Sequence, residues 1–256
     1  MTAATLRQMK ITIVTAVYNR AETVAGAIAS VARQSYGDIE HLIIDGASTD
    51  GTLAAVEAAR HPAMRVISEP DRGIYDALNK GFDLACGDVL GLVHSDDFLA
   101  HDKVVERVMA AFCDPDVDAV YGDLDYVAAA SPAKVIRHWR AGALSQAKLR
   151  WGWMPPHPAI FLRRRVWETH GKYDTSYRIA GDYEAILRWF GQGRIRAAYI
   201  PEVMVKMRWG GESNRSLARI LRKSGEDYRA LRANGMGGAA TLCFKNLSKI
   251  SQFYVR

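Results

Sequence analysis

Short apolar runs alternate with amphipathic stretches over the first 125 residues. The runs are rich in β-branched residues and predict buried strands at 11–17, 41–44, 64–68, 89–93 and 119–121. Between them, apolar residues recur at helical spacing and predict helices at 21–34, 49–60, 73–86 and 102–112. This alternation is typical of an α/β fold with a mostly parallel, doubly wound central sheet and helices on both faces.

The alternation fades after about residue 125. Residues 127–158 are richer in Trp, Arg and Pro. The later pattern predicts a strand at 197–200 and helices at 163–169, 182–191, 216–233 and 239–254. We therefore divide the chain into an α/β half (1–125), a mixed half (126–214) and a helical tail (215–256).

Composition narrows the class of protein. Hydrophobic residues make up 49% and charged residues 24% of the chain, as in ordinary globular proteins. We expect neither a transmembrane helix nor a signal peptide, because no apolar stretch is long enough. The three cysteines lack paired or metal-ligand spacing, which favours a reducing cytoplasm and argues against a zinc site.

Positive charge is concentrated in the tail. The formal net charge is +6, yet residues 207–256 alone hold ten basic and three acidic residues. Apolar residues of the two predicted tail helices can share one face with basic residues around it. Such a tail can contact an anionic membrane or a nucleic acid, or it can pack on the rest of the protein.

Polar clusters follow four of the predicted strands, at 18–20, 45–50, 69–72 and 95–97. Ligands of open parallel sheets bind at the carboxyl ends of the strands, so we expect these clusters to share one edge.

Two clusters contain acids that need an explanation. Asp96 and Asp97 are adjacent like charges, and Mg²⁺ or Mn²⁺ would relieve their repulsion. The alternative is that the pair caps the helix near Asp102. In the second cluster, residues 48–50 can cap a helix, but capping does not explain Asp45 at the strand end.

Several segments together resemble the family-two glycosyltransferases, the inverting enzymes of the Rossmann-like GT-A fold. The resemblance covers about residues 10 to 212. The matching segments are 11–18 (ITIVTAVY), 43–52 (IIDGASTDGT), 68–81 (SEPDRGIYDALNKG), 94–97 (HSDD), 154–162 (MPPHPAIFL) and 178–184 (RIAGDYE). Each segment alone is a weak signal, whereas their common order is specific.

The resemblance implies a nucleotide-sugar donor, Mn²⁺ or Mg²⁺, and a glycan or polyprenyl-linked acceptor in exopolysaccharide or O-antigen biosynthesis. It makes 1–125 the nucleotide-sugar-binding half and 126–214 the acceptor-binding, catalytic half. By motif, Asp97 would hold the metal. The residues that would border the donor are Thr15, Ala16, Val17, Tyr18, Asp45, Asp71, Arg72 and Asp96.

An inverting displacement needs a general base to deprotonate the acceptor hydroxyl. Asp182 matches the family's base position, and Glu184 is the second candidate. The alternative is that Asp182 is only an N-cap or first-turn acid favoured by the helix dipole. His157 and Arg208 are candidates for contacts with the acceptor or the diphosphate, although a loop histidine without a catalytic duty fits equally well.

Two departures from the family pattern change the expected substrate. Gly46 stands where many relatives have a second acid tied to uracil, so UDP is our first expectation and GDP the second. The Gln-x-x-Arg-Trp motif of processive synthases is missing, which favours transfer of a single sugar.

Three other functions are less consistent with the sequence. A nicotinamide-dependent oxidoreductase lacks its Gly-x-Gly-x-x-Gly after the first strand. A nucleic-acid-binding protein leaves Asp96, Asp97 and Asp182 without a role, so we expect no nucleic-acid partner. A degenerate transferase that only binds nucleotide would not need all these acids. We expect a cytoplasmic protein, with peripheral contact to the inner face of the plasma membrane as one role for the tail.

Overall fold

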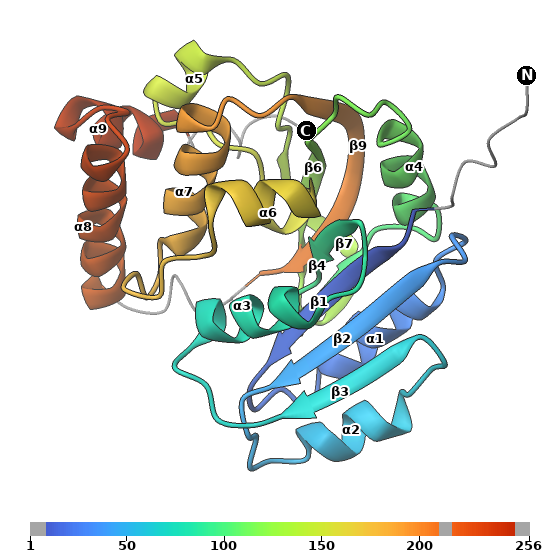
Figure 1. Ribbon diagram of the computed structural model, residues 1–256. Helices are drawn as coiled ribbons and strands as arrows, with labels where there is room; N and C mark the ends of the chain where they lie inside the picture. The colour runs from blue at the N-terminus through green and yellow to red at the C-terminus, as the bar shows by residue number, and fades with distance from the viewer. Residues whose placement is uncertain (1–8, 210–216, 249–256) are drawn as a thin grey trace, which may run out of the picture.

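A computed structural model describes residues 9–209 and 217–248 of the chain. Its strands form one mixed sheet, in the order β3-β2-β1-β4-β8-β6-β9-β5, with β7 paired to β6 (Figure 1). The strands are β1 (Ile11–Val17), β2 (Ile39–Asp45), β3 (Met64–Ser68), β4 (Val89–Leu92), β5 (Asp97–Leu99), β6 (Ala119–Ala128), β7 (Ser131–Trp139), β8 (Ile160–Arg163) and β9 (Ala197–Arg208).

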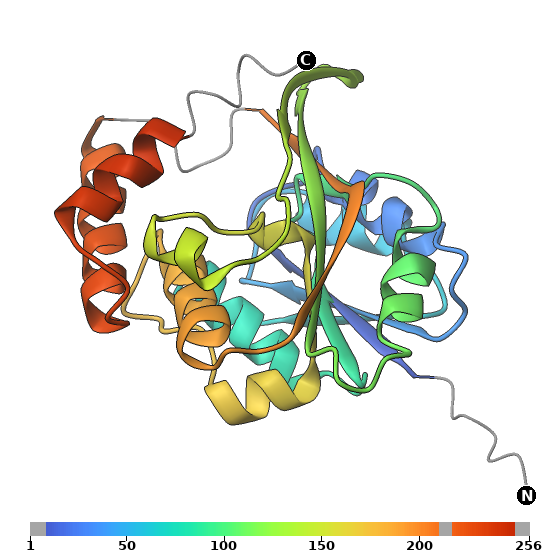
Figure 2. The same cartoon turned by 90° about the horizontal axis from the view of Figure 1, so that it is seen from above.

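Helices cover both faces of this sheet (Figures 1 and 2). One buried cluster joins the sheet to α3, α6 and α7, and others join its opposite face to α1, α2 and α4. A 3₁₀ turn spans His157–Ala159 and a π-helical turn spans Leu187–Gln192. The α-helices are α1 (Val24–Ala32), α2 (Thr52–Ala58), α3 (Ile74–Leu84), α4 (Val104–Ala111), α5 (Gln146–Arg150), α6 (Arg164–His170), α7 (Gly181–Ile186), α8 (Leu217–Ala233) and α9 (Ala239–Ser248).

The first half of the chain forms the parallel part of the sheet, as its pattern predicts. Strands β3, β2, β1 and β4 run parallel to one another. Their register places Val17 beside Asp45 and Asp45 beside Ser68. The predicted α/β fold is therefore confirmed, and the carboxyl ends of β1, β2 and β3 meet at one edge.

The second half departs from the sequence-based expectation. Strands β5, β7 and β8 were not expected, and β6 and β9 extend well beyond 119–121 and 197–200. In β6 the apolar run is interrupted by Gly122, Asp123 and Asp125. Asp123 is nevertheless accommodated inside the protein, because Ala141 N and Tyr199 Oη each donate to its carboxylate at 2.8 Å.

The tail packs on the rest of the protein where it is described. Tyr177, Tyr183 and Leu187 form a buried cluster with Ala230 and Leu231 of α8. The expected helix at 239–254 is described only to residue 248, and the remainder of the 215–256 tail lies outside the described residues. In the described ranges, no helix is long and apolar enough to cross a membrane.

Candidate active site

Val17, Asp45 and Ser68 lie side by side at the ends of β1, β2 and β3, with Asp45 in the middle. Its carboxylate is fully buried and is bound by two donors. Ser68 Oγ donates to Asp45 Oδ2 at 2.6 Å, and Ser48 N donates to the same oxygen at 3.1 Å. Asp45 thus ties the end of β3 to the turn after β2, a structural contact that requires no ligand.

The end of β1 presents only one exposed side chain among the four residues singled out there. Thr15, Ala16 and Val17 are buried, and Thr15 Oγ contacts His41 Nε2 at 3.0 Å inside the sheet. Tyr18 is 56% exposed. Of these four, Tyr18 alone can offer its ring to a ligand at the surface.

Asp71 lies directly over the glycine that replaces the expected second acid. A Cβ atom at Gly46 would be 2.4 Å from Asp71 Oδ2 and 3.4 Å from the Tyr18 ring. Asp71 is held in this place by Gly73 N, which donates to Asp71 Oδ1 at 2.8 Å. A carboxylate from the β3–α3 loop therefore occupies the space that a side chain at position 46 would fill.

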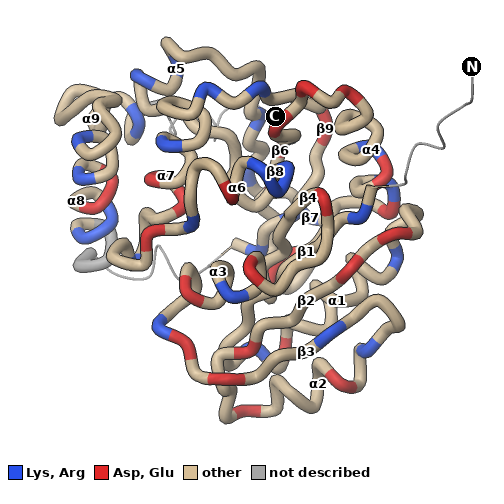
Figure 3. Tube along the Cα trace, in the orientation of Figure 1, with Lys and Arg blue, Asp and Glu red and all other residues tan. Residues whose placement is uncertain are grey.

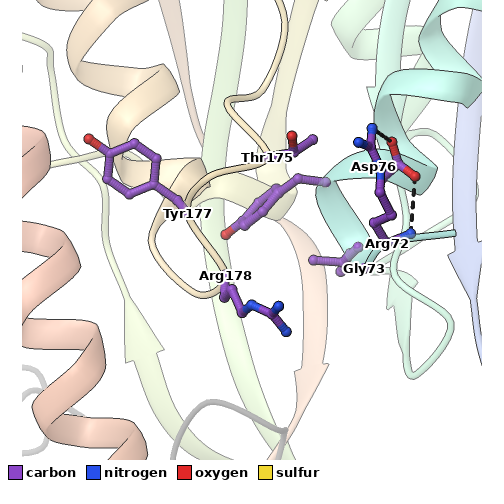
Figure 4. Close-up of a pocket in the computed structure, with 8 residues that line it drawn as sticks. Arg72, Gly73, Asp76, Thr175, Tyr177 and Arg178 are labelled. Atoms are coloured by element: carbon purple, nitrogen blue, oxygen red, sulfur yellow. Dashed lines mark hydrogen bonds and ion pairs between the residues drawn. The ribbon is translucent and has the colours of Figure 1, made fainter.

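Arg72 points into solvent from the start of α3. Its side chain is 79% exposed, and its guanidinium donates to Asp76 Oδ1 at 2.9 Å. Beside this ion pair is a pocket of about 400 Å³ between α3 and the loop before α7 (Figure 4). Its lining includes Ile74, Tyr75 and Arg178.

The two adjacent aspartates follow β4 and differ in burial. Asp96 lies in a turn and is partly exposed, whereas Asp97 begins β5, opposite Met207 of β9, and is 1% exposed. The helix near Asp102 begins at Val104 after Lys103, so the pair does not form its N-cap.

Asp97 has one carboxylate oxygen with a donor and one without. Arg208 N donates to Oδ1 at 3.3 Å, while the buried Oδ2 has no hydrogen-bond partner among the described residues. Burial, reinforced by the charge of Asp96, raises the pKa of Asp97 well above its usual value. A buried carboxylate in this state favours either a proton or a bound cation.

Arg208 lies against both aspartates. Besides the contact from its backbone, its guanidinium donates to Asp96 O at 2.6 Å. The same guanidinium stacks over the Phe98 ring at 5.1 Å. The end of β9 therefore places a fixed cation beside the acidic pair.

The side chains present fit a hard divalent cation. The unpartnered Asp97 Oδ2 is a suitable ligand, and Asp96 adds a second acid next to it. No cluster of three or more His, Cys, Asp or Glu side chains within residues 9–209 and 217–248 is arranged to hold a metal. The protein alone thus offers an incomplete set of ligands, of the kind that substrate phosphates can complete.

Asp182 lies in the first turn of α7, close to a buried tyrosine. Tyr183 N donates to Asp182 Oδ1 at 2.8 Å, and Tyr75 Oη is 3.3 Å from the same oxygen. Tyr75 Oη also donates to Ile179 O at 2.8 Å. Ala180, rather than Asp182, is the N-cap residue, so the helix dipole can stabilise Asp182 but its capping is left to other groups.

Uncharged polar groups surround Asp182. Burial lowers the pKa of His157 to about 4, and it lowers the pKa of His94 as well. His157 Nε2 contacts Tyr173 Oη at 2.8 Å. Both imidazoles are consequently neutral at pH 7, and the negative charge of Asp182 is not cancelled by an imidazolium.

Asp97 and Asp182 both affect the hydroxyl of Tyr126 electrostatically. Burial raises the pKa of Tyr126; the charge of Arg137 opposes this shift, and the charges of Asp97 and Asp182 add to it. The acids from the β4–β5 turn and from α7 therefore lie on one polar region of the protein, although 85 residues separate them in the sequence.

Glu184 has a structural partner. It is 7% exposed, and Arg188 donates to both of its carboxylate oxygens, at 3.0 and 2.9 Å. This bidentate pair occupies the side chain, so Asp182 is the candidate base that we carry forward.

Several polar side chains of this region were not singled out from the sequence. Their hydroxyl and imidazole groups reach the site only through tertiary contacts. The groups are Ser68, Tyr75, His94, Tyr126 and Tyr173. Ser68, Tyr75 and His94 stand inside matching segments, which was the one available signal.

Solved structures identify the fold. A mannosyltransferase, PcManGT from Pyrobaculum calidifontis, in complex with GDP-Man and Mn²⁺, aligns with a TM-score of 0.67 at 20% identity over 97% of this chain and 70% of that one. S. aureus TarS in complex with UDP-GlcNAc aligns with a TM-score of 0.62 at 17% identity over 88% and 65%. The fold is the GT-A fold of nucleotide-sugar transferases.

The chain belongs to glycosyl transferase family 2, whose model matches residues 12–175. A PGL/p-HBAD biosynthesis glycosyltransferase of Mycobacterium bovis is 33% identical over 205 residues, which cover 77% of this chain and 76% of that protein. The succinoglycan biosynthesis protein ExoO of Rhizobium meliloti is 30% identical over 188 residues, or 68% of this chain and 53% of that protein. The protein is thus a glycosyltransferase.

Proposed function

We propose that the protein is an inverting, metal-dependent glycosyltransferase that moves one sugar from a nucleotide-diphosphate sugar to a hydroxyl of a glycan or polyprenyl-linked acceptor. Asp97 is the metal ligand and Asp182 is the general base. The proposal is supported most directly by Asp97 Oδ2, a buried acidic oxygen without a partner in the described ranges, beside Arg208.

The residues around Asp97 bind the departing diphosphate. A divalent metal, when bound, supplies positive charge that offsets the charge developing on the leaving group. Arg208 lies next to that place and is fixed by its contact with Asp96 O, so it adds a second positive charge without reorganising.

Asp182 takes the proton of the acceptor hydroxyl. The buried imidazoles near it are neutral at pH 7, and Tyr75 keeps its phenolic proton, so neither kind of group competes for the role of base. Burial, followed by the charge of Asp182, raises the pKa of Tyr75 well above 10. The Tyr75 hydroxyl therefore acts as a fixed neighbour that orients the carboxylate.

The pocket beside Tyr75 is our candidate for the acceptor. Tyr75 lines this pocket, and its hydroxyl lies 3.3 Å from Asp182 Oδ1, which supports placing the acceptor hydroxyl here. Ile74 and Tyr177 provide apolar surface, and Arg178 adds a charge at the rim. Such a lining suits a sugar ring, which has both apolar and polar surfaces.

The donor nucleotide is UDP or GDP in this proposal, so the base is uracil or guanine. Solved relatives hold GDP-Man and UDP-GlcNAc, respectively, which supports both. Tyr18, Asp71 and the edge at Gly46 form the surface that we assign to the base. An acidic group there accepts hydrogen bonds from ring N–H groups, which both uracil and guanine have.

The tail is our candidate for a contact with an anionic membrane at the cytoplasmic face. Leu221, Phe244 and Leu247 are 66%, 54% and 62% exposed. Phe244 lies 5.0 Å, ring to ring, from Trp151, which is also more than half exposed. Figure 3 shows basic residues on α8 and α9 near this surface, a combination that suits anionic lipids. Relatives named for glycolipid or polysaccharide biosynthesis are consistent with such an acceptor location.

Ligand-dependent thermal stability tests the donor site. Wild type is melted with UDP, GDP and their sugars, each with Mn²⁺ or EDTA. Ligands that bind only the folded protein raise the melting temperature. At a hundredfold excess over Kd they add about 2.7 kcal/mol to the free energy of unfolding. We expect a shift with one nucleotide that requires the metal. The absence of a shift with every nucleotide contradicts the donor site.

Asp182→Asn tests the base. The variant should bind metal and nucleotide as the wild type does, while transfer falls by about 10² to 10⁴-fold, the usual contribution of general base catalysis. Glu184→Gln is the comparison for the second acid and should chiefly lower stability. Near-normal transfer by Asp182→Asn overturns the assignment.

A further inference from the structure

Helix α8 holds the segment that leads into the catalytic helix. The carboxylate of Glu226 accepts hydrogen bonds from three successive backbone amides, those of Arg178, Ile179 and Ala180. The shortest distances are 3.1, 2.8 and 2.9 Å, respectively. These three residues directly precede α7, so an acid 44 residues beyond Asp182 in the sequence organises the start of its helix.

This contact lies just before the first turn of α7: Glu226 binds the amides up to the N-cap residue, not those of the turn itself. A helix leaves its first amides without intrahelical partners, and a Ser, Thr, Asp or Asn at the N-cap usually binds one of them. The N-cap of α7 is Ala180, which makes no side-chain cap. Glu226 instead brings a negative charge from another helix to the positive end of α7.

Helices α8 and α9 also contact the side chains on both sides of these amides. The guanidinium of Arg229 lies 3.7 Å from the Tyr177 ring centroid and donates to Ser176 Oγ at 3.3 Å. Beyond the amides, Lys245 Nζ lies 3.1 Å from the centroid of the Tyr183 ring. Residues 176–183, which we call the base segment, are therefore held by α8 and α9 along their length.

A continuous chain of contacts connects Glu226 to the base. Ile179 donates its N–H to Glu226 and accepts the Tyr75 hydroxyl on its carbonyl at 2.8 Å. The Tyr75 hydroxyl in turn lies 3.3 Å from Asp182 Oδ1. Moving the backbone of Ile179 would therefore displace the group that orients Asp182.

We propose that Glu226 is a positioning residue for Asp182, and that α8 is part of the catalytic unit. This inference rests on the proposed role of Asp182 as base. Glu226 touches neither the donor edge nor the acids of the β4–β5 turn, so its removal misplaces the base without disturbing nucleotide binding. A misplacement of about 1 Å can lower a rate by about a hundredfold.

Glu226→Ala and Glu226→Gln in the full-length protein test the proposal. We expect hydrogen exchange at Arg178, Ile179 and Ala180 to become faster in Glu226→Ala. The turnover number should fall about 10- to 100-fold while the KM for the donor and the metal-dependent nucleotide shift stay at wild-type values. Glu226→Gln keeps one accepting oxygen and should recover part of the loss.

Two controls separate positioning from loss of charge or of stability. Arg232→Ala removes an exposed charge from the same helix and should leave turnover unchanged. Val56→Ala destabilises the core under β2, remote from α8, and shows what an equal drop in melting temperature does to turnover.

The outcomes distinguish the two proposals. Unchanged exchange in the base segment of Glu226→Ala overturns the positioning role, whether or not transfer is measurable. Faster exchange with wild-type turnover also overturns it. No transfer by the wild type with any nucleotide sugar overturns the proposed function instead, and with it the catalytic meaning of the contact.

Discussion

Asp45 and Asp97 are both aspartates at strand ends, and both are buried, yet their surroundings differ. Asp45 is 0% exposed and receives two donors on one oxygen, from Ser68 and Ser48. Asp97 is 1% exposed, and its Oδ2 has no donor from the described residues. Burial alone therefore does not single out an acid, and it is the missing partner that leads us to propose a metal-binding role for Asp97 and not for Asp45.

The largest expected effect is that of Asp97→Asn. Transfer should fall about a thousandfold, the equivalent of several kcal/mol of lost charge stabilisation. The metal-dependent nucleotide shift should disappear. In EDTA, however, the variant should be more stable than wild type, because wild type must either take up a proton on Asp97 or bury its charge on folding, whereas Asn does neither. A gain of about 1 kcal/mol corresponds to about 2–4 °C.

This gain should depend on pH in a defined direction. The folded, metal-free protein keeps a proton on Asp97 above the usual pKa of 3.8, where the unfolded chain has lost it. The stability of the metal-free wild type therefore falls as pH rises from 3.8 toward the raised pKa. Melting curves in EDTA should show the advantage of Asp97→Asn at pH 7 and none below pH 3.8. A lower melting temperature than wild type at pH 7 would contradict our view of Asp97.

The matched substitution at the other acid should have the opposite sign. Asp45→Asn places an amide where Ser48 N and Ser68 Oγ need an acceptor, at a cost of about 1–3 kcal/mol. The loss should be the same with and without metal, and it is measured by denaturant unfolding. If Asp45→Asn instead stabilises the protein, the contrast between the two acids is wrong.

His41 gives a third buried titratable group, on the same strand as Asp45. Burial, together with the nearby His61, lowers the pKa of His41 from 6.5 to about 3. Between these values the unfolded chain binds a proton that the folded protein does not, so stability falls as pH decreases, by about 1.4 kcal/mol per pH unit. His41→Gln should flatten this slope in unfolding experiments between pH 6 and 4. An unchanged slope would assign the acid sensitivity to other groups.

The smallest expected effect concerns the donor edge. Gly46→Ala places a methyl group 2.4 Å from Asp71 Oδ2, so Asp71 must shift. Nucleotide affinity should fall several-fold, equivalent to about 1 kcal/mol, and Asp71→Ala should lower it similarly. Gly51→Ala is the control, because a Cβ there meets only ordinary contact at 3.6 Å. Isothermal titration with the preferred nucleotide measures all three, and wild-type affinity in Gly46→Ala would remove Asp71 from the site.

The parallel half and its acids were predictable because local patterns determine them. Apolar runs marked β1 to β4, and the strand-end rule brought Asp45 to the expected edge. The contact between Tyr75 and Asp182 was not predictable, since it joins residues 107 apart. The π-helical turn after α7 likewise escaped a pattern that indicates only a helix at 182–191.

The second half was less predictable for a physical reason. Strand β7 is an edge strand with its first six residues exposed, so no alternation of buried and exposed side chains marks it. The short β5 carries only three residues. The tail helices were indicated by their amphipathic pattern, but the sequence leaves open whether they contact lipid or protein. The hydrogen bonds that Glu226 accepts from the amides of residues 178–180 depend on tertiary packing.

The pairing of β5 also bears on how the enzyme is made by the ribosome. In the part of the chain that is described, β5 pairs only with β9, and Asp97 meets the backbone of Arg208, 111 residues later. At a synthesis rate of about 5–20 residues per second, those residues follow about 6 to 20 seconds after Asp97. A nascent chain of the first 200 residues can thus assemble the parallel strands but not the cation site. In newly made protein the proposed cation site therefore forms only after nearly all of the sheet has been synthesised.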